Sequence, residues 1–338
     1  MNLSQEMYTR YALCREMGET AEVVRNFDPS VVEPFLPSLK GLKKILFTGE
    51  GSSRIFPAKR ALAENRRSPG KHELFTEGST QALEYDLTGT AVFGASNSGK
   101  TKELLRLIYQ LQKSEAGVTV PIFGLTANGG TPLTEAADLS HVLTCGPEDA
   151  VAATKSVVEQ ALFYQALLWE LKGEKLTGFS DAADQILSVL ALPVDPSLVD
   201  KLLKAPRIYF AGRNDGVSEE LTLKINEITR KPSAFLEGTY ALHGIEEVMS
   251  PEEVLILVNP FIEEEKMYQK RLVEGVGMTV LAIADRPTPF PTIQIPPGGA
   301  FSEYLQLTAG WNLMVEVGIS AGVNLDKPVR ARKVGNEF

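Results

Sequence analysis

The sequence has few of the residues that build disulfide frameworks and metal sites. It contains two cysteines, Cys14 and Cys145, which lie far apart in the chain, and three histidines, none of them at a spacing typical of zinc ligands. Two distant cysteines also provide no disulfide framework. We therefore expect two free thiols and no metal site.

Long apolar runs and clusters of basic residues are missing as well. Nowhere do enough apolar residues follow one another to span a membrane, and residues 1–7 have neither the basic nor the apolar region of a signal peptide. The 34 lysines and arginines are outnumbered by 43 aspartates and glutamates, which gives a net charge of −9. We expect a cytoplasmic protein that binds neither membranes nor nucleic acid.

Short apolar strands alternate with helical periodicity along both halves of the chain. Hydrophobic residues form 43% of the 338 residues, enough for two cores of medium size. The alternation predicts an α/β fold whose parallel sheets are covered by helices on both faces. Besides a strand that ends near Gly94, the predicted strands are residues 44–48, 120–126, 141–144, 207–210, 254–258, 279–283 and 292–295. The predicted helices are residues 55–62, 102–113, 152–171 and 217–229, a helix from Glu263 and a long final helix.

The order of these units in the first half returns in the second half, which indicates an internal duplication. We predict an N-terminal helical segment over residues 1–38, a first domain over 39–190 and a second domain over 191–338. Prolines at 193 and 196 interrupt regular structure near the boundary between the two domains.

The turn at residues 94–101 joins a strand to a helix and consists of glycine and small polar residues. Free backbone N–H groups and the positive end of the helix dipole meet at such a turn, so it can hold a phosphate. The matching turn of the second half, residues 259–265, ends in three glutamates that would repel an anion. We therefore expect phosphate binding in the first half alone.

Two interpretations of this turn are open. Residues 94–101 satisfy the nucleotide-binding pattern G-x-x-x-x-G-K-[ST], in which Lys100 would reach the outer phosphates and Thr101 would hold magnesium. That interpretation needs an aspartate after a neighbouring strand, and its candidate, Asp285, lies in the other half. Alternatively, the hydroxyls of Ser96, Ser98 and Thr101 and the backbone N–H groups hold a single terminal phosphate.

Several segments match one family in order along the chain. They are Gly51-Ser52-Ser53, Ser-x-Ser-Gly-x-Thr at 96–101, Val151-Ala-Ala-Thr-Lys155 with Gln160, the helix 220–228, and His243-Gly244. The chain resembles the double-SIS (sugar isomerase) domain family, which includes the isomerase half of glucosamine-6-phosphate synthase and the stand-alone fructosamine-6-phosphate deglycases. Ala153 replaces a usual serine, and Ile245 replaces a usual proline.

The resemblance implies a fold of two SIS-type three-layer αβα sandwiches and a small-molecule sugar phosphate as substrate, without a cofactor. It also implies a homodimer with shared active sites, because the histidine loop of the family comes from the neighbouring subunit. The substrate-binding residues that it implies are Gly51, Ser52, Ser53, Ser96, Asn97, Ser98, Thr101, Val151, Ala153 and Glu220.

Glu220, Lys224 and Glu227 are spaced i, i+4 and i+7, so they share one face of a helix. By itself this spacing favours a solvated face with salt bridges. The resemblance implies that Glu227 shuttles a proton between neighbouring sugar carbons, that His243 helps to open the sugar ring, and that Lys224 and Glu220 line the pocket. Lys333, in the C-terminal tail, would pair with a substrate oxygen or form an imine.

We therefore expect an enzyme that acts on a ketose or amino-sugar 6-phosphate through an enediol or enolamine, as an isomerase or an Amadori-product deglycase. We expect no glutaminase activity, because Asn2 rather than cysteine follows Met1. The alternatives are a non-catalytic sugar-phosphate sensor and a P-loop nucleotide-binding protein.

Overall fold

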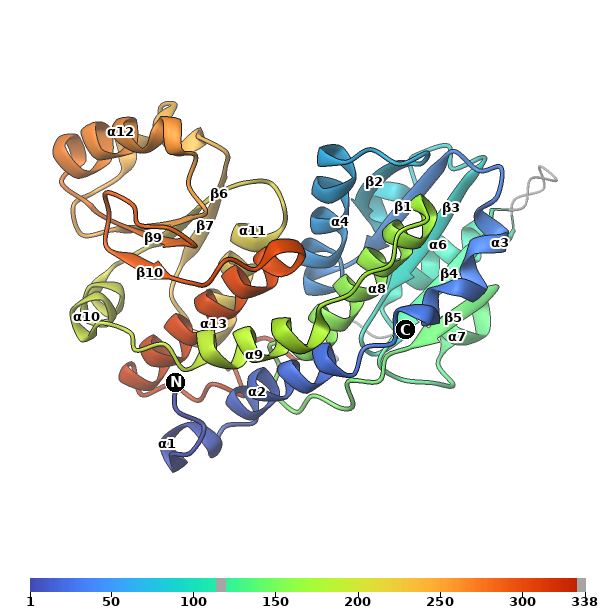
Figure 1. Cartoon of the computed structure of the whole chain (residues 1–338), viewed down its shortest axis with the longest axis horizontal. Coiled ribbons are helices and arrows are strands. Elements are labelled where there is room, and N and C mark those ends of the chain that lie inside the picture. Colours follow the sequence, from blue (N-terminus) through green and yellow to red (C-terminus); the bar gives the residue numbers. More distant parts are fainter. Residues whose placement is uncertain (114–119, 333–338) are drawn as a thin grey trace. The chain divides into compact units, whose positions relative to one another are not determined.

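The computed structural model describes residues 1–113 and 120–332, which form two compact units (Figure 1). Within the described residues, unit 1 comprises Met1–Glu22, Asp149–Ala152 and the chain from Ser180 onwards, and unit 2 comprises Val23–Glu148 and Ala153–Phe179. Both units are assembled from separated stretches, whereas the predicted domains are continuous ranges. No helix of the described residues is both long and apolar enough to cross a membrane.

Unit 2 contains a five-stranded parallel sheet in the order β2-β1-β3-β4-β5. Its strands are β1 (Lys44–Gly49), β2 (Glu73–Gly78), β3 (Thr90–Ala95), β4 (Ile122–Thr126) and β5 (Leu139–Val142). Its helices are α3 (Leu36–Leu39), α4 (Ile55–Arg67), α5 (Ser79–Ala82), α6 (Lys102–Gln112), α7 (Pro132–Ala136) and α8 (Lys155–Lys172), preceded by the 3₁₀ segment Pro29–Phe35.

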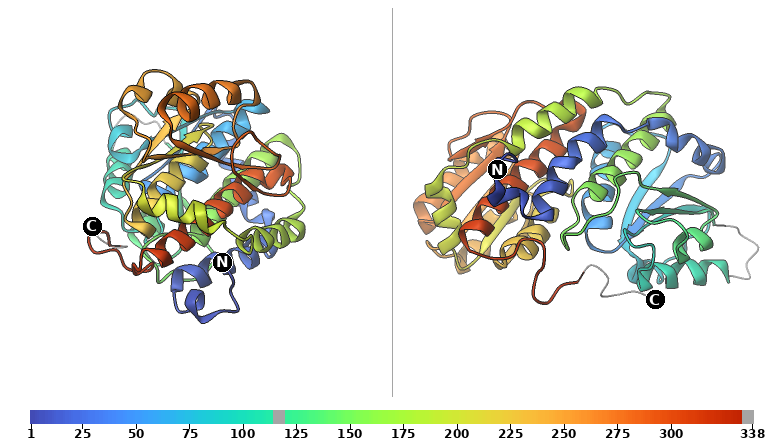
Figure 2. Two further views of the ribbon diagram at one scale, coloured as in Figure 1. Left: turned by 90° about the vertical axis from the view of Figure 1, so that its left-hand side faces the viewer. Right: turned by 90° about the horizontal axis from the view of Figure 1, so that it is seen from below.

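Successive strand residues of unit 2 point to opposite faces of the sheet, so they enter two different cores. Phe47, Phe93 and Phe123 form an aromatic cluster with Phe163 and Tyr164 of α8. The preceding residue of each strand is aliphatic and packs in the cores on the α5 to α7 side: Leu46, Val92 and Ile122. Helices therefore cover both faces, as predicted for parallel strands (Figures 1 and 2).

Unit 1 contains a second five-stranded parallel sheet, in the order β7-β6-β8-β9-β10. Its strands are β6 (Ile208–Gly212), β7 (Ser233–Glu237), β8 (Val254–Val258), β9 (Thr279–Ala284) and β10 (Thr292–Gln294). Its helices are α1 (Glu6–Thr9), most of α2 (Ala12–Arg25), nearly all of α9 (Phe179–Leu190), α10 (Pro196–Lys204), α11 (Val217–Thr229), α12 (Glu265–Tyr268) and α13 (Ser302–Ser320).

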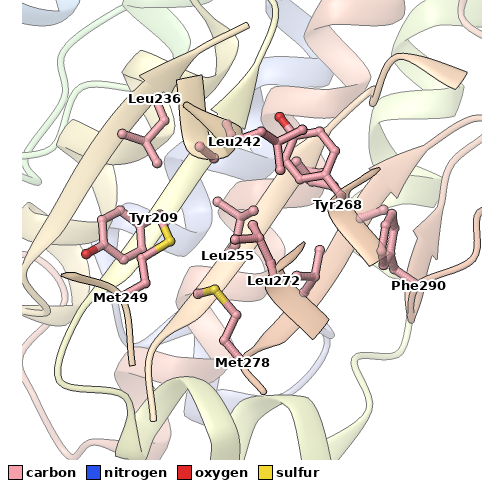
Figure 3. Close-up of a cluster of buried hydrophobic side chains, with 14 residues drawn as sticks. Tyr209, Leu236, Leu242, Met249, Leu255, Tyr268, Leu272, Met278 and Phe290 are labelled. Carbon is pink, nitrogen blue, oxygen red and sulfur yellow. The ribbon is translucent and has the colours of Figure 1, made fainter. Parts of the chain in front are cut away.

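One face of the unit 1 sheet is covered by the segments that follow β7 and by α12 with its continuation. Tyr209 and Leu255 of the sheet pack there against Leu242, Tyr268 and Leu272 (Figure 3). Helices α11 and α13 pack closely together: a Cβ built on Gly310 of α13 would lie 2.3 Å from Leu221 Cδ2 of α11. The absence of a side chain at 310 therefore permits this close approach.

The two sheets share one topology, because each places its third strand beside its first and its second strand at the edge. A shared detail strengthens the likeness. Gly49 ends β1 and Gly212 ends β6, and a Cβ built there would lie 2.6 Å from Ala95 O and 2.5 Å from Val258 O, respectively. The predicted fold of two parallel α/β units of one design is confirmed.

The elements differ from the predicted ones at a few places. The edge strands β2 and β7 were not predicted, and the helix expected from Glu263 consists of the short α12 and the π-helical segment Gln269–Val276. The predicted N-terminal helical segment contains α1, α2, Pro29–Phe35 and α3.

Candidate active site

The turn between β3 and α6, residues 96–101, is called the cradle turn below. Ser96 is buried, and its Oγ lies 2.8 Å from Thr101 Oγ1 and accepts a hydrogen bond from the Gly99 N–H at 3.1 Å. The Lys100 N–H donates to Ser98 Oγ at 3.2 Å. Thr101 is the N-cap of α6, while Lys100 is exposed. Hydroxyls and backbone N–H groups therefore gather at a helix N-terminus, the chemistry that holds a phosphate.

Gly99 gives this turn its shape. Its φ of +67° lies in the left-handed region, and a Cβ added there would lie 2.2 Å from Thr131 Oγ1. Thr131 is itself the N-cap of α7 and accepts a hydrogen bond from the Thr134 N–H. Both the conformation and the space at 99 therefore require glycine.

The 3₁₀ turn Gly51–Ser53 follows β1, the strand beside β3. Gly49 pairs with Ala95 in register, so both turns begin at the carboxyl ends of their strands, on the same side of the sheet. Ser52 and Ser53 are half-buried. The structure therefore places the predicted phosphate-binding residues of both turns at the carboxyl ends of β1 and β3 in unit 2.

Glu148, a buried carboxylate that the sequence does not single out, contacts the cradle turn. Glu148 accepts hydrogen bonds from Asn97 Nδ2 at 3.1 Å, Ser156 Oγ at 2.7 Å and the Thr154 N–H at 2.8 Å. Asn97 Nδ2 also donates to Ser156 Oγ at 2.8 Å. Glu148 therefore connects the cradle turn to the start of α8, whose N-cap, Thr154, directly follows the predicted residue Ala153. An acidic residue shortly before a helix is a capping signal, but its bond to Asn97, 51 positions earlier, has no signal in the sequence.

Glu220, Lys224 and Glu227 form one cluster on α11 of unit 1. Lys224 Nζ lies 3.2 Å from Glu220 Oε1 and 3.0 Å from Glu227 Oε2. The side chains of Glu220 and Lys224 are each 1% exposed, whereas that of Glu227 is 20% exposed. The alternative of a solvated salt-bridged face is therefore wrong for Glu220 and Lys224.

The two carboxylates keep Lys224 charged. Burial alone lowers the pKa of Lys224, but the negative charges of Glu227 and Glu220 and their hydrogen bonds outweigh it and raise that pKa above its ordinary value. Lys224 is therefore a buried cation held between two carboxylates.

His243 lies in unit 1 on the loop after the 3₁₀ turn Tyr240–Leu242. Its ring is exposed, and Nε2 lies 3.3 Å from Thr239 Oγ1 of the same loop. Val151, also in unit 1, donates its N–H to Asp326 O at 2.9 Å. Lys333 lies outside the described residues.

The turn after β8 is the unit 1 counterpart of the cradle turn. Asn259 has a φ of +46°, and the 3₁₀ segment Ile262–Glu264 and α12 follow. Glu265 is buried and pairs with Arg286 at 2.7 Å, while Glu263 is exposed. No hydroxyl side chain stands between β8 and α12, so this turn does not reproduce the cradle.

The remaining candidate groups offer no metal site. Among residues 1–113 and 120–332, no group of three or more His, Cys, Asp or Glu side chains could hold a metal ion. Cys14 and Cys145 are free thiols, as predicted, and both are buried.

Comparison with protein families gives a match to the FtsK/SpoIIIE family over residues 57–205, less than half of the 338-residue chain. This stretch includes the cradle turn with its G-x-x-x-x-G-K-T pattern. The strands beside β3 are followed by Glu50 and Ala127, so neither supplies the aspartate that holds magnesium in P-loop nucleotide hydrolases. Asp285 follows β9, in the other sheet.

The curated relatives are glutamine–fructose-6-phosphate aminotransferases (isomerizing). The chain is 25% identical to that of Aeropyrum pernix over 268 residues, which cover 71% of this chain and 42% of the relative. It is 24% identical to that of Sulfurisphaera tokodaii over 281 residues, which cover 80% of this chain and 46% of the relative. The chain thus spans less than half the length of these relatives.

Solved structures share the fold over nearly the whole chain. The C-terminal domain of glucosamine-fructose-6-phosphate aminotransferase from Francisella tularensis superposes with a TM-score of 0.75 at 20% identity, covering 94% of this chain and 98% of that one. Tagatose-6-phosphate ketose/aldose isomerase from Escherichia coli gives 0.76 at 18% identity, covering 98% and 99%. Glucosamine-6-phosphate deaminase from Thermotoga maritima gives 0.72 at 21% identity, covering 95% and 98%. The chain therefore has the double-SIS fold and is related in sequence to the glutamine–fructose-6-phosphate aminotransferases.

Proposed function

We propose that this protein is a phosphosugar enzyme of the isomerase type, acting on a ketose or amino-sugar 6-phosphate. The cradle turn of unit 2 binds the phosphate, and the α11 cluster of unit 1 carries out the proton transfer. Ser96, Ser98 and Thr101 supply hydroxyls for the phosphate, with Ser52 and Ser53 at the same sheet edge, and no cofactor takes part.

One observation carries the proposal: Glu227 is partly exposed while its partner Lys224 is buried, at 3.0 Å. A carboxylate in contact with solvent can reach a substrate carbon, and a buried cation beside it can stabilise the negative charge that develops on the neighbouring oxygen. Such a pair is suited to proton abstraction next to a carbonyl.

In this mechanism, the Glu227 carboxylate removes the proton from the carbon beside the carbonyl group. The enediol or enolamine that results takes the proton back at the neighbouring carbon, while a second proton leaves the hydroxyl that becomes the new carbonyl and is taken up by the heteroatom of the old one. Lys224 and Glu220 orient Glu227, and His243 acts as the acid that opens the sugar ring. Lys333 would pair with a substrate oxygen or form an imine with the carbonyl carbon.

Isomerase, deaminase and deglycase chemistry share these first steps. Solved structures of the same fold include a ketose/aldose isomerase and a deaminase. We propose isomerase or Amadori-product deglycase activity for this chain. The products separate the two, because a deglycase releases an amine and an isomerase does not.

Nucleotide binding is the second candidate, favoured by the pattern at residues 94–101 and by the FtsK/SpoIIIE match. A thermal-shift panel of sugar 6-phosphates, fructose-amine 6-phosphates and ATP with magnesium decides between the two candidates, followed by turnover assays of each binder. We expect stabilisation by sugar phosphates and none by ATP. Stabilisation by ATP with magnesium alone would refute the phosphosugar proposal, and binding of a sugar phosphate without turnover would identify a sensor.

We further propose a homodimer in which His243 serves the active site of the second subunit. Mixing refolded Glu227→Gln and His243→Ala variants tests this. If the two residues act from different subunits, each mixed dimer regains one intact site, and random pairing restores about a quarter of wild-type activity. If they act from the same subunit, or if the protein works as a monomer, the mixture remains inactive.

A further inference from the structure

Helix α11, which carries Glu227, ends on a residue with an unusual backbone conformation. Arg230, its C-cap, has a φ of 63° and a ψ of 14°, in the left-handed region where glycine is the ordinary choice. Among the non-glycine residues that the structure describes, Asn259 is the other one with a positive φ. A strained backbone persists when its surroundings over-determine it, so the contacts of the Arg230 side chain are informative.

The Arg230 guanidinium makes contacts in two directions. Nη1 donates to the Glu227 and Ile228 carbonyls at the end of α11, the second at 2.9 Å. Nη2 donates to the carbonyl of Asn324, in the chain that follows α13. A glycine at 230 would adopt the same backbone without strain, but it could not make the contact with Asn324.

Residues 324–326, called the anchor segment here, are held by further contacts. Asn324 Oδ1 accepts the N–H groups of Asp326 and Lys327 at 2.9 and 3.1 Å, which folds the segment into a turn. The Leu325 side chain is fully buried, and a Cβ built on Gly318 of α13 would lie 2.5 Å from Leu325 Cδ2. The segment is therefore packed against α13 as well as held by α11.

Asp326 connects the anchor segment to two other parts of unit 1. Its carboxylate accepts the N–H groups of Ala12 and Leu13 at 3.0 and 2.8 Å, at the start of α2. Its carbonyl accepts the N–H of Val151 at 2.9 Å. The Glu227 helix, the anchor segment and the loop of Val151 thus form one hydrogen-bonded chain within unit 1.

We propose that Arg230 and Asp326 are positioning residues, which hold Glu227 and Val151 in a fixed relation through the anchor segment. The role rests on the proposed function, in which Glu227 moves the proton, and on the substrate contact that the family resemblance implies for Val151. Arg230 acts through α11 and Asp326 acts through Val151, and neither needs to touch the substrate.

Arg230→Gly tests the proposal with little risk to folding, because glycine suits the conformation at this position. We expect the midpoint of thermal unfolding to stay within a few degrees of wild type, kcat to fall about tenfold or more, and amide exchange at residues 324–327 and at Val151 to become about tenfold faster. Asp326→Asn, which keeps the shape but weakens the acceptor, should change exchange and kcat in the same direction.

Lys231→Met is the matched control. Lys231 follows Arg230 directly and also donates to carbonyl groups, those of Leu203 and Ala205 at the end of α10. It makes the same type of contact with a different helix, so we expect wild-type kcat and wild-type exchange at residues 324–327.

Unchanged exchange at residues 324–327 in Arg230→Gly would overturn the proposal. Faster exchange there with wild-type kcat would overturn the positioning role. The exchange measurement does not depend on turnover, so it decides whether the anchor exists even if wild type turns over no sugar phosphate, the result that would count against the proposed function itself.

Discussion

The turns after β3 and β8 occupy the same place in two sheets of one topology, yet their chemistry is opposite. After β3, hydroxyls and backbone N–H groups surround the start of α6, an eleven-residue helix. After β8, two glutamates precede α12 and a third begins it, and this four-residue helix passes into a π-helical segment. A regular helix with hydroxyls and free N–H groups at its N-terminus suits an anion, and an acidic and irregular one does not.

In the helices that follow β1 and β6, the candidate catalytic groups lie in unit 1 and not in unit 2. In unit 1, α11 carries the buried Lys224 between two carboxylates. In unit 2, the corresponding helix α4 has its buried Arg60 paired with Glu64, which also accepts a hydrogen bond from Trp169 of α8. Both carboxylate oxygens of Glu64 thus have a partner inside unit 2. Because the fold occurs twice, the chain has two sets of turns at the carboxyl ends of parallel strands. The proposed function assigns phosphate binding to the set in unit 2 and proton transfer to unit 1.

The largest effect should follow from Glu227→Gln. The amide keeps the shape of the side chain but cannot accept the substrate proton, so we expect kcat to fall about 10²- to 10⁴-fold. Affinity for the sugar phosphate should change little, because the phosphate contacts lie in the other unit. Steady-state kinetics and calorimetric binding of the same ligand measure the two effects separately.

Glu219→Gln is the control for this variant, since Glu219 is a half-exposed glutamate of the same helix. It should retain wild-type kcat. A wild-type kcat in Glu227→Gln would remove Glu227 from the mechanism.

Gly99→Ala should have the next largest effect, on the cradle turn. The left-handed φ of Gly99 and the overlap with Thr131 Oγ1 act together, so we expect a loss of about 2 kcal/mol or more in the free energy of unfolding. Sugar-phosphate affinity should fall as well. Urea unfolding and calorimetric titration measure these changes.

Gly130→Ala provides a matched comparison for Gly99→Ala. Gly130 has a similar φ of +65°, but no atom lies within 4 Å of an added Cβ. Backbone strain alone should cost about 1 kcal/mol there, and phosphate affinity should be kept. Equal losses in the two variants would show that the contact with Thr131 does not shape the cradle.

The sequence could predict the elements whose signal is local. β8 is Val-Leu-Ile-Leu-Val with all five residues buried, and its apolar run identifies it directly. The edge strands β2 and β7 each have one buried residue, and they are strands because they pair with β1 and β6. Pairing across the sheet leaves no periodicity in such short segments, so both were missed.

The candidate site shows the same division between local and distant signals. The spacing of Glu220, Lys224 and Glu227 places them on one helix face, which the sequence alone predicts. Whether that face is buried depends on how α11 packs in the folded chain, and spacing does not report it. The contact of Glu148 with Asn97 and that of Arg230 with Asn324 join residues 51 and 94 positions apart, so they were found only in the structure.

The free energy of unfolding should depend on pH through different groups in the two units, with a moderate effect on stability. In unit 2, burial raises the pKa of Glu159, but the nearby His141 ring, with Nε2 at 3.9 Å, and hydrogen bonds from Thr144 and Cys145 outweigh it and leave the pKa below its ordinary value. The stabilisation is therefore present above the ordinary carboxyl pKa of about 4.3 and lost as the pH falls through the lower folded value. In unit 1, the raised pKa of Lys224 has the opposite sign: its contribution is present below about pH 10.4 and lost as the pH rises further.

Glu159→Gln should therefore lower stability at pH 7 by about 1–2 kcal/mol, and the difference from wild type should shrink as the pH falls toward 3. The alkaline limb should remain as in wild type. Urea unfolding over this pH range measures both, with the exposed Glu135→Gln as control. A difference from wild type that stays constant with pH would show that the charge of Glu159 is not what stabilises unit 2.

The smallest effect is expected from Lys100→Ala, the substitution that would be the most damaging in a P-loop. Lys100 is exposed, so its charge is screened by water, and its loss should weaken sugar-phosphate binding less than about threefold. Ser96→Ala should weaken the same binding about tenfold, because Ser96 Oγ is buried and bonds to both Thr101 and the Gly99 N–H. The order of the two effects, measured by calorimetry with one sugar phosphate, identifies the groups that hold the anion. If Lys100→Ala proved the more harmful, the lysine and not the hydroxyls would be the main phosphate ligand, and the contrast between the β3 and β8 turns would be one of charge alone.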